Sequence, residues 1–154
     1  MTEKRLEALE PEQQELLNAA EKAMERGWNP RSNFVVGAAI RGKSGKIYTG
    51  ANVTLSTTGM TACAEVAAFL AANMAGEREF TAIATIVRND GMSVDAPSGP
   101  CGRCRQIIFE FSQMASVEPM LTLYSNTDKS RVIVATIEDY LPSPFLSGRL
   151  REKR

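Results

Sequence analysis

The stretch TACAEVAAFLAANMAGEREFTAIATIV, residues 61–87, decides the fold because it places a helix directly before a buried strand. Residues 61–75 are rich in alanine and contain neither Gly nor Pro, which predicts a helix with Thr61 as its N-cap and Gly76 as its stop. Residues Phe80–Val87 form a continuous apolar run, typical of a strand covered on both faces. A helix followed by a buried strand indicates a layered α/β domain with this strand near the centre of its sheet.

The sequence before this stretch predicts a helix and then a hairpin. Apolar residues recur at helical spacing over residues 11–26. Two runs of strand character follow, Phe34–Arg41 and Lys46–Val53, and the sequence GKSG at 42–45 has the composition of a tight turn. We therefore expect these two runs to pair with each other.

The sequence after the central strand continues the alternation of helix and strand. A helix is predicted from CGRCRQIIFEFSQM, residues 101–114, then strands at Met120–Tyr124 and Val132–Ala135, and a short capped helix at 136–139. Some neighbouring strands joined by a helix should run parallel. The expected fold is therefore a three-layer α/β/α domain with a mixed five-stranded sheet.

Length and composition describe an ordinary globular protein. Residues 1–154 are expected to form a single domain, with a core at about 11–142 and a basic C-terminal tail. Lys plus Arg and Asp plus Glu both total 18, and this balance argues against polynucleotide binding and favours a small-molecule partner. We see neither a secretory signal nor an apolar stretch approaching the roughly 20 residues of a bilayer span, so a cytoplasmic protein with no membrane partner is expected.

The cysteines predict a metal site. Cys63, Cys101 and Cys104 are the only cysteines, histidine is absent, and both cysteine clusters lie where a loop becomes a helix. Unpaired N–H groups at a helix start stabilise thiolates. A structural zinc site normally closes its tetrahedron with four Cys or His ligands, whereas this chain offers three. We therefore expect bound Zn²⁺ with water at its fourth position.

Glu65 is the expected catalytic residue, because it lies two positions after a ligand and is free to move protons. As a carboxylate it would accept a proton from the metal water, and as an acid it would donate to a ring nitrogen and to a departing amino group. Cys63-Ala64-Glu65 followed by Pro100-Cys101-Gly102-Arg103-Cys104 matches the motif of zinc deaminases, in which the Glu is not a ligand.

With these motifs, the chain resembles the small homotetrameric cytidine deaminases and the related blasticidin-S deaminases over roughly residues 11–142. The resemblance implies zinc-dependent hydrolytic deamination of cytidine, deoxycytidine or a related cytosine nucleoside to the uracil form, with release of ammonia. It also implies a homotetramer and a place in pyrimidine salvage.

The same resemblance implies a set of substrate contacts. Phe34, which opens the stretch FVVGAA, would line the pyrimidine pocket, and Asn52 in GANV would hydrogen-bond the ribose. Ala64, between the first ligand and the catalytic Glu, would also contact the substrate. Phe145 matches a C-terminal aromatic residue that closes the pocket, from a neighbouring subunit.

Two departures from the cytidine deaminases favour a different substrate as an alternative. Thr54 stands where that family usually has a sugar-binding Glu, and Val66 stands where it usually has an Arg that stabilises the thiolates. Arg103, inside the second cluster, would take over this stabilising role. An Arg at that inner position and the sequence Leu141-Pro142-Ser143 are similar to the blasticidin-S deaminases, so blasticidin S or a modified cytosine nucleoside is the alternative substrate.

Other classes of protein fit parts of the sequence. Cys101-Gly102-Arg103-Cys104 also suits a redox dithiol, but that function gives no role to Cys63 or Glu65. The sequence GAAIRGKS at 37–44 matches the phosphate-loop pattern, yet it continues a predicted strand instead of opening a helix. A non-catalytic zinc-binding domain is the remaining alternative, and it would not need Glu65.

Overall fold

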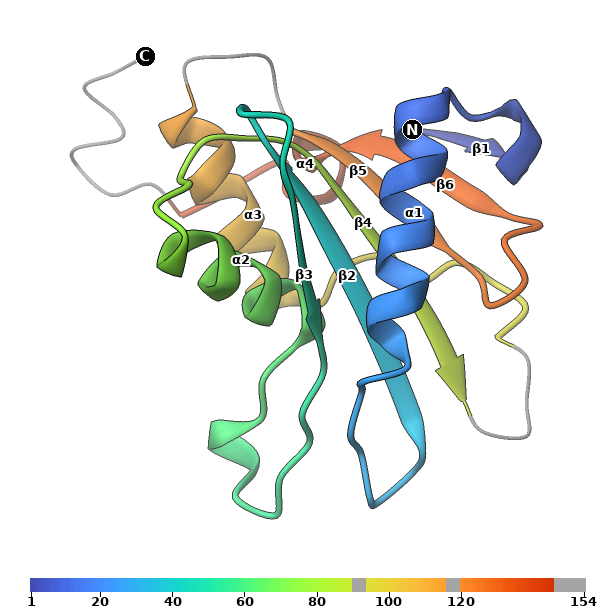
Figure 1. The fold of residues 1–154 in the computed structure, drawn as a ribbon, viewed down its shortest axis with the longest axis vertical. Coiled ribbons are helices and arrows are strands. Elements are labelled where there is room, and N and C mark those ends of the chain that lie inside the picture. The colour runs from blue at the N-terminus through green and yellow to red at the C-terminus, as the bar shows by residue number, and fades with distance from the viewer. Residues whose placement is uncertain (90–93, 116–119, 146–154) are drawn as a thin grey trace.

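A mixed sheet of six strands forms the middle of the molecule, in the order β1-β6-β5-β4-β2-β3 (Figure 1). The computed structural model describes residues 1–89, 94–115 and 120–145, and the basic tail at 148–154 lies outside them. The strands are β1 Thr2–Lys4, β2 Phe34–Gly42, β3 Ile47–Ala51, β4 Phe80–Asn89, β5 Leu121–Ser125 and β6 Val132–Thr136.

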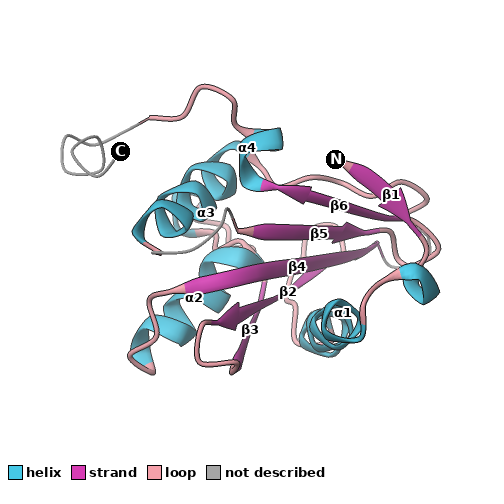
Figure 2. Ribbon diagram, turned by 90° about the horizontal axis from the view of Figure 1, so that it is seen from above, coloured by secondary structure: helices cyan, strands magenta, loops and turns pink. Residues whose placement is uncertain are grey.

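Helices cover both faces of this sheet, which confirms the predicted three layers. Figure 2 shows α1 on one side and α2 and α3 on the other. The α helices are α1 Pro11–Met24, α2 Ala64–Met74, α3 Gly102–Met114 and α4 Ile137–Tyr140, and the 3₁₀ turns are Leu6–Ala8 and Thr58–Met60.

The prediction of five strands was wrong by one, because it missed β1. Thr2 to Lys4 pair antiparallel with β6, and Arg131 at the start of β6 forms an ion pair with Glu3. The segment has no apolar run or alternation that local sequence could reveal. Only the exposed edge of β6, created by the rest of the fold, makes it a strand.

The order of the strands follows the expected rules. β4 lies between β2 and β5, as predicted for the central strand, and it runs parallel to β5, to which α3 connects it. β2 and β3 form the predicted antiparallel hairpin, with Gly45 at positive φ (+84°) in its turn. Because Gly37 to Gly42 belong to β2, and β3 follows the turn, this segment cannot be a phosphate loop.

Two glycines set how closely the helices approach the sheet. A Cβ at Gly37 in β2 would overlap the backbone of α1 at Ala20 and Met24. A Cβ at Gly50 in β3 would overlap the backbone of α2 at Ala64 and Ala68. In both cases the added Cβ would meet backbone atoms, so no side-chain rotation could relieve the overlap. Gly50 directly supports the first turn of α2.

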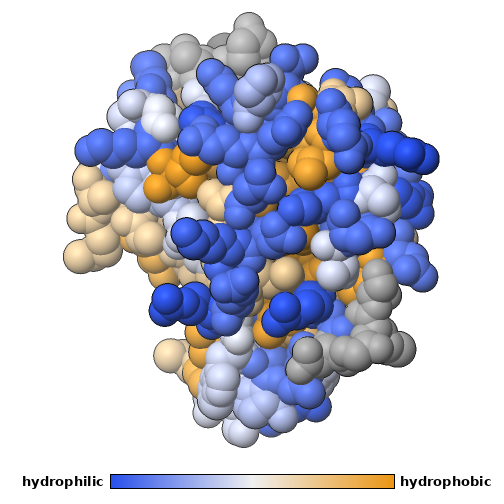
Figure 3. Space-filling view, turned by 45° about the vertical axis from the view of Figure 1, so that its right-hand side comes forward, coloured by the Kyte–Doolittle hydropathy of each residue, from blue (hydrophilic) through white to orange (hydrophobic). Residues whose placement is uncertain are grey.

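The apolar core is divided by the sheet into two clusters. One lies under α1 and includes Leu16, Leu17 and Ile86, and the other lies under α2 and α3 and includes Phe69, Phe80 and Phe109. The face of the molecule in Figure 3 is mostly hydrophilic, with its apolar residues in separate patches. None of the helices in the described ranges is both long enough and apolar enough to cross a bilayer.

Candidate active site

The three cysteine sulfurs converge where α2 and α3 begin. Cys63 is the N-cap of α2, Cys101 is the N-cap of α3, and Cys104 lies in the first turn of α3. All three Sγ atoms lie within 4.8 Å of one another, and those of Cys63 and Cys101 are 3.8 Å apart. Tetrahedral zinc with bonds of about 2.3 Å spaces its sulfur ligands by about 3.8 Å. The predicted cluster therefore exists and suits zinc.

The start of α2 differs from the prediction in a way that matters for this site. The N-cap is Cys63 and not Thr61, because a 3₁₀ turn at Thr58–Met60 and an isolated bridge from Ala62 to Val53 precede the helix. The sulfur of Cys63 thus lies at the positive end of the helix, where a thiolate is stabilised. The displaced Thr61 accepts a hydrogen bond from Arg103 through its carbonyl (3.3 Å), which ties the two ligand clusters together.

Interactions among the sulfurs shift the pKa values of Cys63 and Cys104 in opposite directions. The hydrogen bond with Cys104 lowers the pKa of Cys63 to about 6, and the nearby charge of Arg103 acts in the same direction. The same hydrogen bond, followed by burial, raises the pKa of the Cys104 thiol. Cys63 is therefore the first of the pair to become a thiolate, and Arg103 lies where a thiolate-stabilising cation was expected.

Glu65 is a buried carboxyl in the first turn of α2. Its residue is only 6% exposed, and it lines the same pocket as Cys63 and Cys101. Burial raises the pKa of this carboxyl above its ordinary value. A carboxyl with a raised pKa can accept and donate a proton closer to neutral pH, as a proton shuttle requires.

The pocket beside the sulfurs contains the predicted substrate contacts. It has a volume of about 310 Å³, and Phe34, Asn52 and Ala64 line it together with Glu65. Phe34 begins β2, Asn52 follows β3, and Ala64 is the first residue of α2. Segments that are far apart in the chain are thus brought around one cavity.

Asn52 also has a structural role that the sequence did not indicate. Its buried side-chain oxygen accepts a hydrogen bond from the Val36 backbone N–H (2.8 Å), and its side-chain nitrogen donates to the Phe34 carbonyl (3.2 Å). The amide therefore fixes the backbone that carries the Phe34 ring.

Phe145 does not line the pocket of its own chain. Its residue is 71% exposed, and its backbone N–H and carbonyl both bond to the side chain of Gln106 (3.2 and 2.9 Å). The expected role of Phe145 in closing the pocket of a neighbouring subunit therefore stays a prediction.

Sequence reasoning missed several polar residues of the pocket, two of them in the sheet. Thr85 and Tyr124 line it from the sheet, on β4 and β5. The available signal was a hydroxyl residue inside an apolar strand run, where a buried polar group needs a reason.

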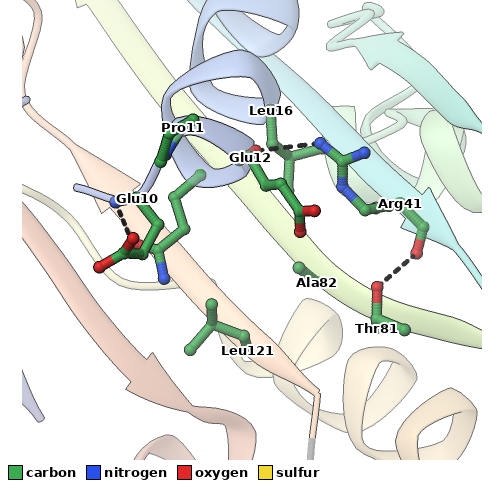
Figure 4. Close-up of a pocket in the computed structure, with 9 residues that line it drawn as sticks. Glu10, Pro11, Glu12, Leu16, Arg41, Thr81, Ala82 and Leu121 are labelled. Carbon is green, nitrogen blue, oxygen red and sulfur yellow. Dashed lines mark hydrogen bonds between the residues drawn. The ribbon is translucent and has the colours of Figure 1, made fainter. Parts of the chain in front are cut away.

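A second and larger hollow lies on the α1 side of the sheet, between Glu10, Arg41 and Leu121 (Figure 4). Its volume is about 550 Å³. Its Arg41 side chain is already bound to the Glu12 carbonyl and to the carboxylate of Glu15. It includes none of the cysteines, so the chemistry belongs to the smaller pocket.

A three-sulfur cluster that suits zinc and a buried carboxyl lie beside each other in this fold, and together they define a hydrolase of the deaminase class. Residues 10–118 match the family model described as the cytidine and deoxycytidylate deaminase zinc-binding region. The chain belongs to this family. The predicted type of enzyme and the predicted zinc cofactor are confirmed at the level of the family.

Comparison with individual proteins agrees with this assignment. The chain is 36% identical to cytidine deaminase from Sporosarcina psychrophila over 132 residues, which is 86% of this chain and 90% of the relative. It is 33% identical to cytidine deaminase from Halalkalibacterium halodurans over 142 residues, 92% and 99% of the two chains. The crystal structure of cytidine deaminase from Burkholderia pseudomallei is similar, with a TM-score of 0.72 at 34% identity, covering 85% of this chain and 97% of that one.

Proposed function

We propose that this protein hydrolyses the C4 amino group of a cytosine nucleoside, cytidine or deoxycytidine, forming the uracil nucleoside and ammonia. The single observation that carries the proposal is the buried Glu65 carboxyl in the pocket beside the sulfur cluster. The names of the relatives, all cytidine deaminases, support the same substrate class. A redox dithiol or a non-catalytic zinc domain would have no use for this carboxyl.

The three thiolates would hold the metal, and Glu65 would move the protons. Zinc, when bound, supplies a water of lowered pKa as the nucleophile. Glu65 would accept one proton from the attacking water and donate it to the ring nitrogen beside C4, and would then carry the second proton to the departing amino group. A C–O bond forms, the C–N bond breaks, one water is consumed and one ammonia leaves, so the carboxylate is regenerated.

The pocket lining supports a nucleoside in preference to a phosphorylated nucleotide. Among the described residues that line it, none is Lys or Arg, the side chains that normally pair with a phosphate. Phe34 would contact the pyrimidine ring, and Asn52 would reach the sugar with the hydrogen-bonding capacity that its backbone contacts leave free.

A second candidate is a modified cytosine nucleoside such as blasticidin S. Thr54 lines the pocket at the position where the cytidine deaminases usually carry a sugar-binding Glu. A hydroxyl at this position cannot accept hydrogen bonds as strongly as a carboxylate. A substrate with an altered sugar would therefore lose less binding free energy here than it would beside a Glu.

We also propose a cytoplasmic, single-domain subunit that works as a homotetramer, with Phe145 of one copy closing the pocket of another. The exposure of Phe145 supports this arrangement. Light scattering of the purified protein checks the tetramer. Phe145→Ala should raise KM without changing the zinc content, and an unchanged KM argues against closure by this residue.

An ammonia-release screen tests the proposed reaction. Zinc-loaded protein is offered cytidine, deoxycytidine, cytosine, blasticidin S and N4-substituted cytidines, with Glu65→Gln as the matched inactive control. We expect release from at least one nucleoside and none from free cytosine, which lacks the sugar. No release from any compound by zinc-loaded protein would refute the proposal.

A further inference from the structure

Two buried hydroxyl groups on neighbouring strands have no hydrogen-bond partner. Thr85 in β4 and Tyr124 in β5 lie opposite each other across the parallel pair, and they are 3% and 1% exposed. Within the described part of the chain, neither Thr85 Oγ1 nor Tyr124 OH makes a hydrogen bond of acceptable geometry, although the two hydroxyls lie close enough for Thr85 to act on the pKa of Tyr124 in the lowering direction. Buried polar atoms without partners are rare in folded proteins, and each one needs an explanation.

A comparable buried hydroxyl outside the pocket does have a hydrogen-bond partner in the sheet. Thr122 lies two residues before Tyr124, on the same face of β5, and its buried Oγ1 donates to the Ala135 carbonyl (3.0 Å). The unpaired hydroxyls are therefore a feature of the positions of Thr85 and Tyr124, and not of this face of the sheet in general.

Both unpaired hydroxyl residues belong to the pocket that contains Glu65. We call its buried side, formed by Glu65, Thr85 and Tyr124, the pocket floor. Burial, followed by the charge of Glu65, raises the pKa of Tyr124 well above its ordinary value. The phenol therefore keeps its proton, remains a hydrogen-bond donor, and lies close enough to Glu65 to be affected by its charge.

We propose, on the basis of the proposed function, that the hydroxyls of Thr85 and Tyr124 bind the amino-bearing edge of the cytosine ring. The reacting carbon must come within proton-transfer reach of Glu65, so the floor beside Glu65 meets that edge of the substrate. Each hydroxyl can both accept and donate a hydrogen bond. The pair can accordingly accept from the amino group of the substrate and donate to the carbonyl oxygen of the product.

This role predicts a particular combination of stability and binding. Thr85→Val and Tyr124→Phe remove only hydroxyls that have no well-formed hydrogen bond to the described residues, so both variants should unfold at the same temperature as the parent or higher. The same variants should bind cytosine nucleosides less well. Thr122→Val, the matched control, removes a hydroxyl with a partner and should lower the unfolding temperature while leaving binding unchanged.

Binding is measured by calorimetry in zinc-loaded Glu65→Gln protein, where turnover does not interfere. Two probes are compared: cytidine, and the ribonucleoside of pyrimidin-2-one, which lacks the amino group. We expect Thr85→Val and Tyr124→Phe each to weaken cytidine binding about 5- to 30-fold, the usual cost of a lost buried hydrogen bond. Affinity for the pyrimidin-2-one ribonucleoside should change less than twofold or so.

The outcomes separate this inference from the proposed function. Unchanged cytidine affinity in both variants, or an equal loss for both probes, overturns the role of the hydroxyl pair even if the wild-type protein releases ammonia. Selective loss of cytidine affinity without ammonia release by the wild type supports the hydroxyl pair and refutes the deaminase. If neither probe binds the Glu65→Gln protein although the wild type releases ammonia, only the role of the hydroxyl pair is overturned; if the wild type also releases no ammonia, both proposals are overturned.

Discussion

Replacement of Glu65 by Gln should abolish turnover while leaving the metal site intact. The amide has nearly the same volume as the carboxyl but cannot take up and release protons. Transfer by a positioned group is typically worth about 10²–10⁴-fold, or about 2.7–5.4 kcal/mol in activation free energy. All three predicted ligands are sulfurs, so the zinc content should stay near one per chain.

The stability of this variant provides a second, independent test. Burial of the Glu65 carboxyl, whose residue is only 6% exposed, disfavours its charged form and so raises its pKa. An amide has no charge to bury, so Glu65→Gln should unfold at a temperature equal to or above that of the wild type.

Three measurements on one preparation test the role of Glu65. They are the zinc content by elemental analysis, kcat by ammonia release, and the midpoint of thermal unfolding. Glu12→Gln is the matched control, because it removes an exposed carboxylate from α1 on the opposite side of the sheet. A Glu65→Gln enzyme with a kcat close to that of this control would refute the role of Glu65. A variant that loses its zinc would show that the carboxyl supports the metal instead.

The other predictions concern the ligands, the packing of α2 and the edge of the sheet. Cys101→Ala should lose stoichiometric zinc and with it activity, and elemental analysis showing retained zinc contradicts its assignment as a ligand. Gly50→Ala should cost about 1–3 kcal/mol of folding free energy, because its Cβ meets backbone of α2, and denaturant unfolding measures this. Hydrogen bonding and charge from Arg131 lower the pKa of Glu3 below 4.5. This pairing therefore stabilises β1 above that pH, and the stabilisation is lost as pH falls through the lower folded-state pKa. Hydrogen exchange of β1 should accelerate in that acidic range, and Glu3→Gln should remove this dependence on pH.

Local sequence predicted the regular elements because each carries its own periodic or compositional signal. The helix after Pro11 has a Pro at its first position and an apolar stripe, and the strand after Phe80 is apolar throughout. The elements that were missed or shifted have weaker local signals. β1 is short and polar, and the start of α2 depends on a bridge between Ala62 and Val53 that no local pattern indicates.

The chemistry of the site was visible in the sequence because its key residues are close together in two short motifs. Cys63, Glu65, Cys101 and Cys104 could be named from spacing, since a metal needs few ligand types and helix starts favour thiolates. The family resemblance also predicted that Phe34, Asn52 and Ala64 line their cavity, whereas Thr85 and Tyr124 were not predicted, because their place in it depends on how distant strands are arranged in the sheet.

Sequence by itself thus predicted most of the elements, a set of three sulfur ligands and a proton shuttle, which all depend on residues near one another in the chain. Only the tertiary structure decided that the three sulfurs lie within 4.8 Å of one another, and that the Asn52 amide holds the backbone of Phe34. The tertiary structure likewise placed two unpaired hydroxyls, on Thr85 and Tyr124, beside Glu65. The physical reason is that burial and partnership are properties of the assembled sheet and helices, and not of any segment alone.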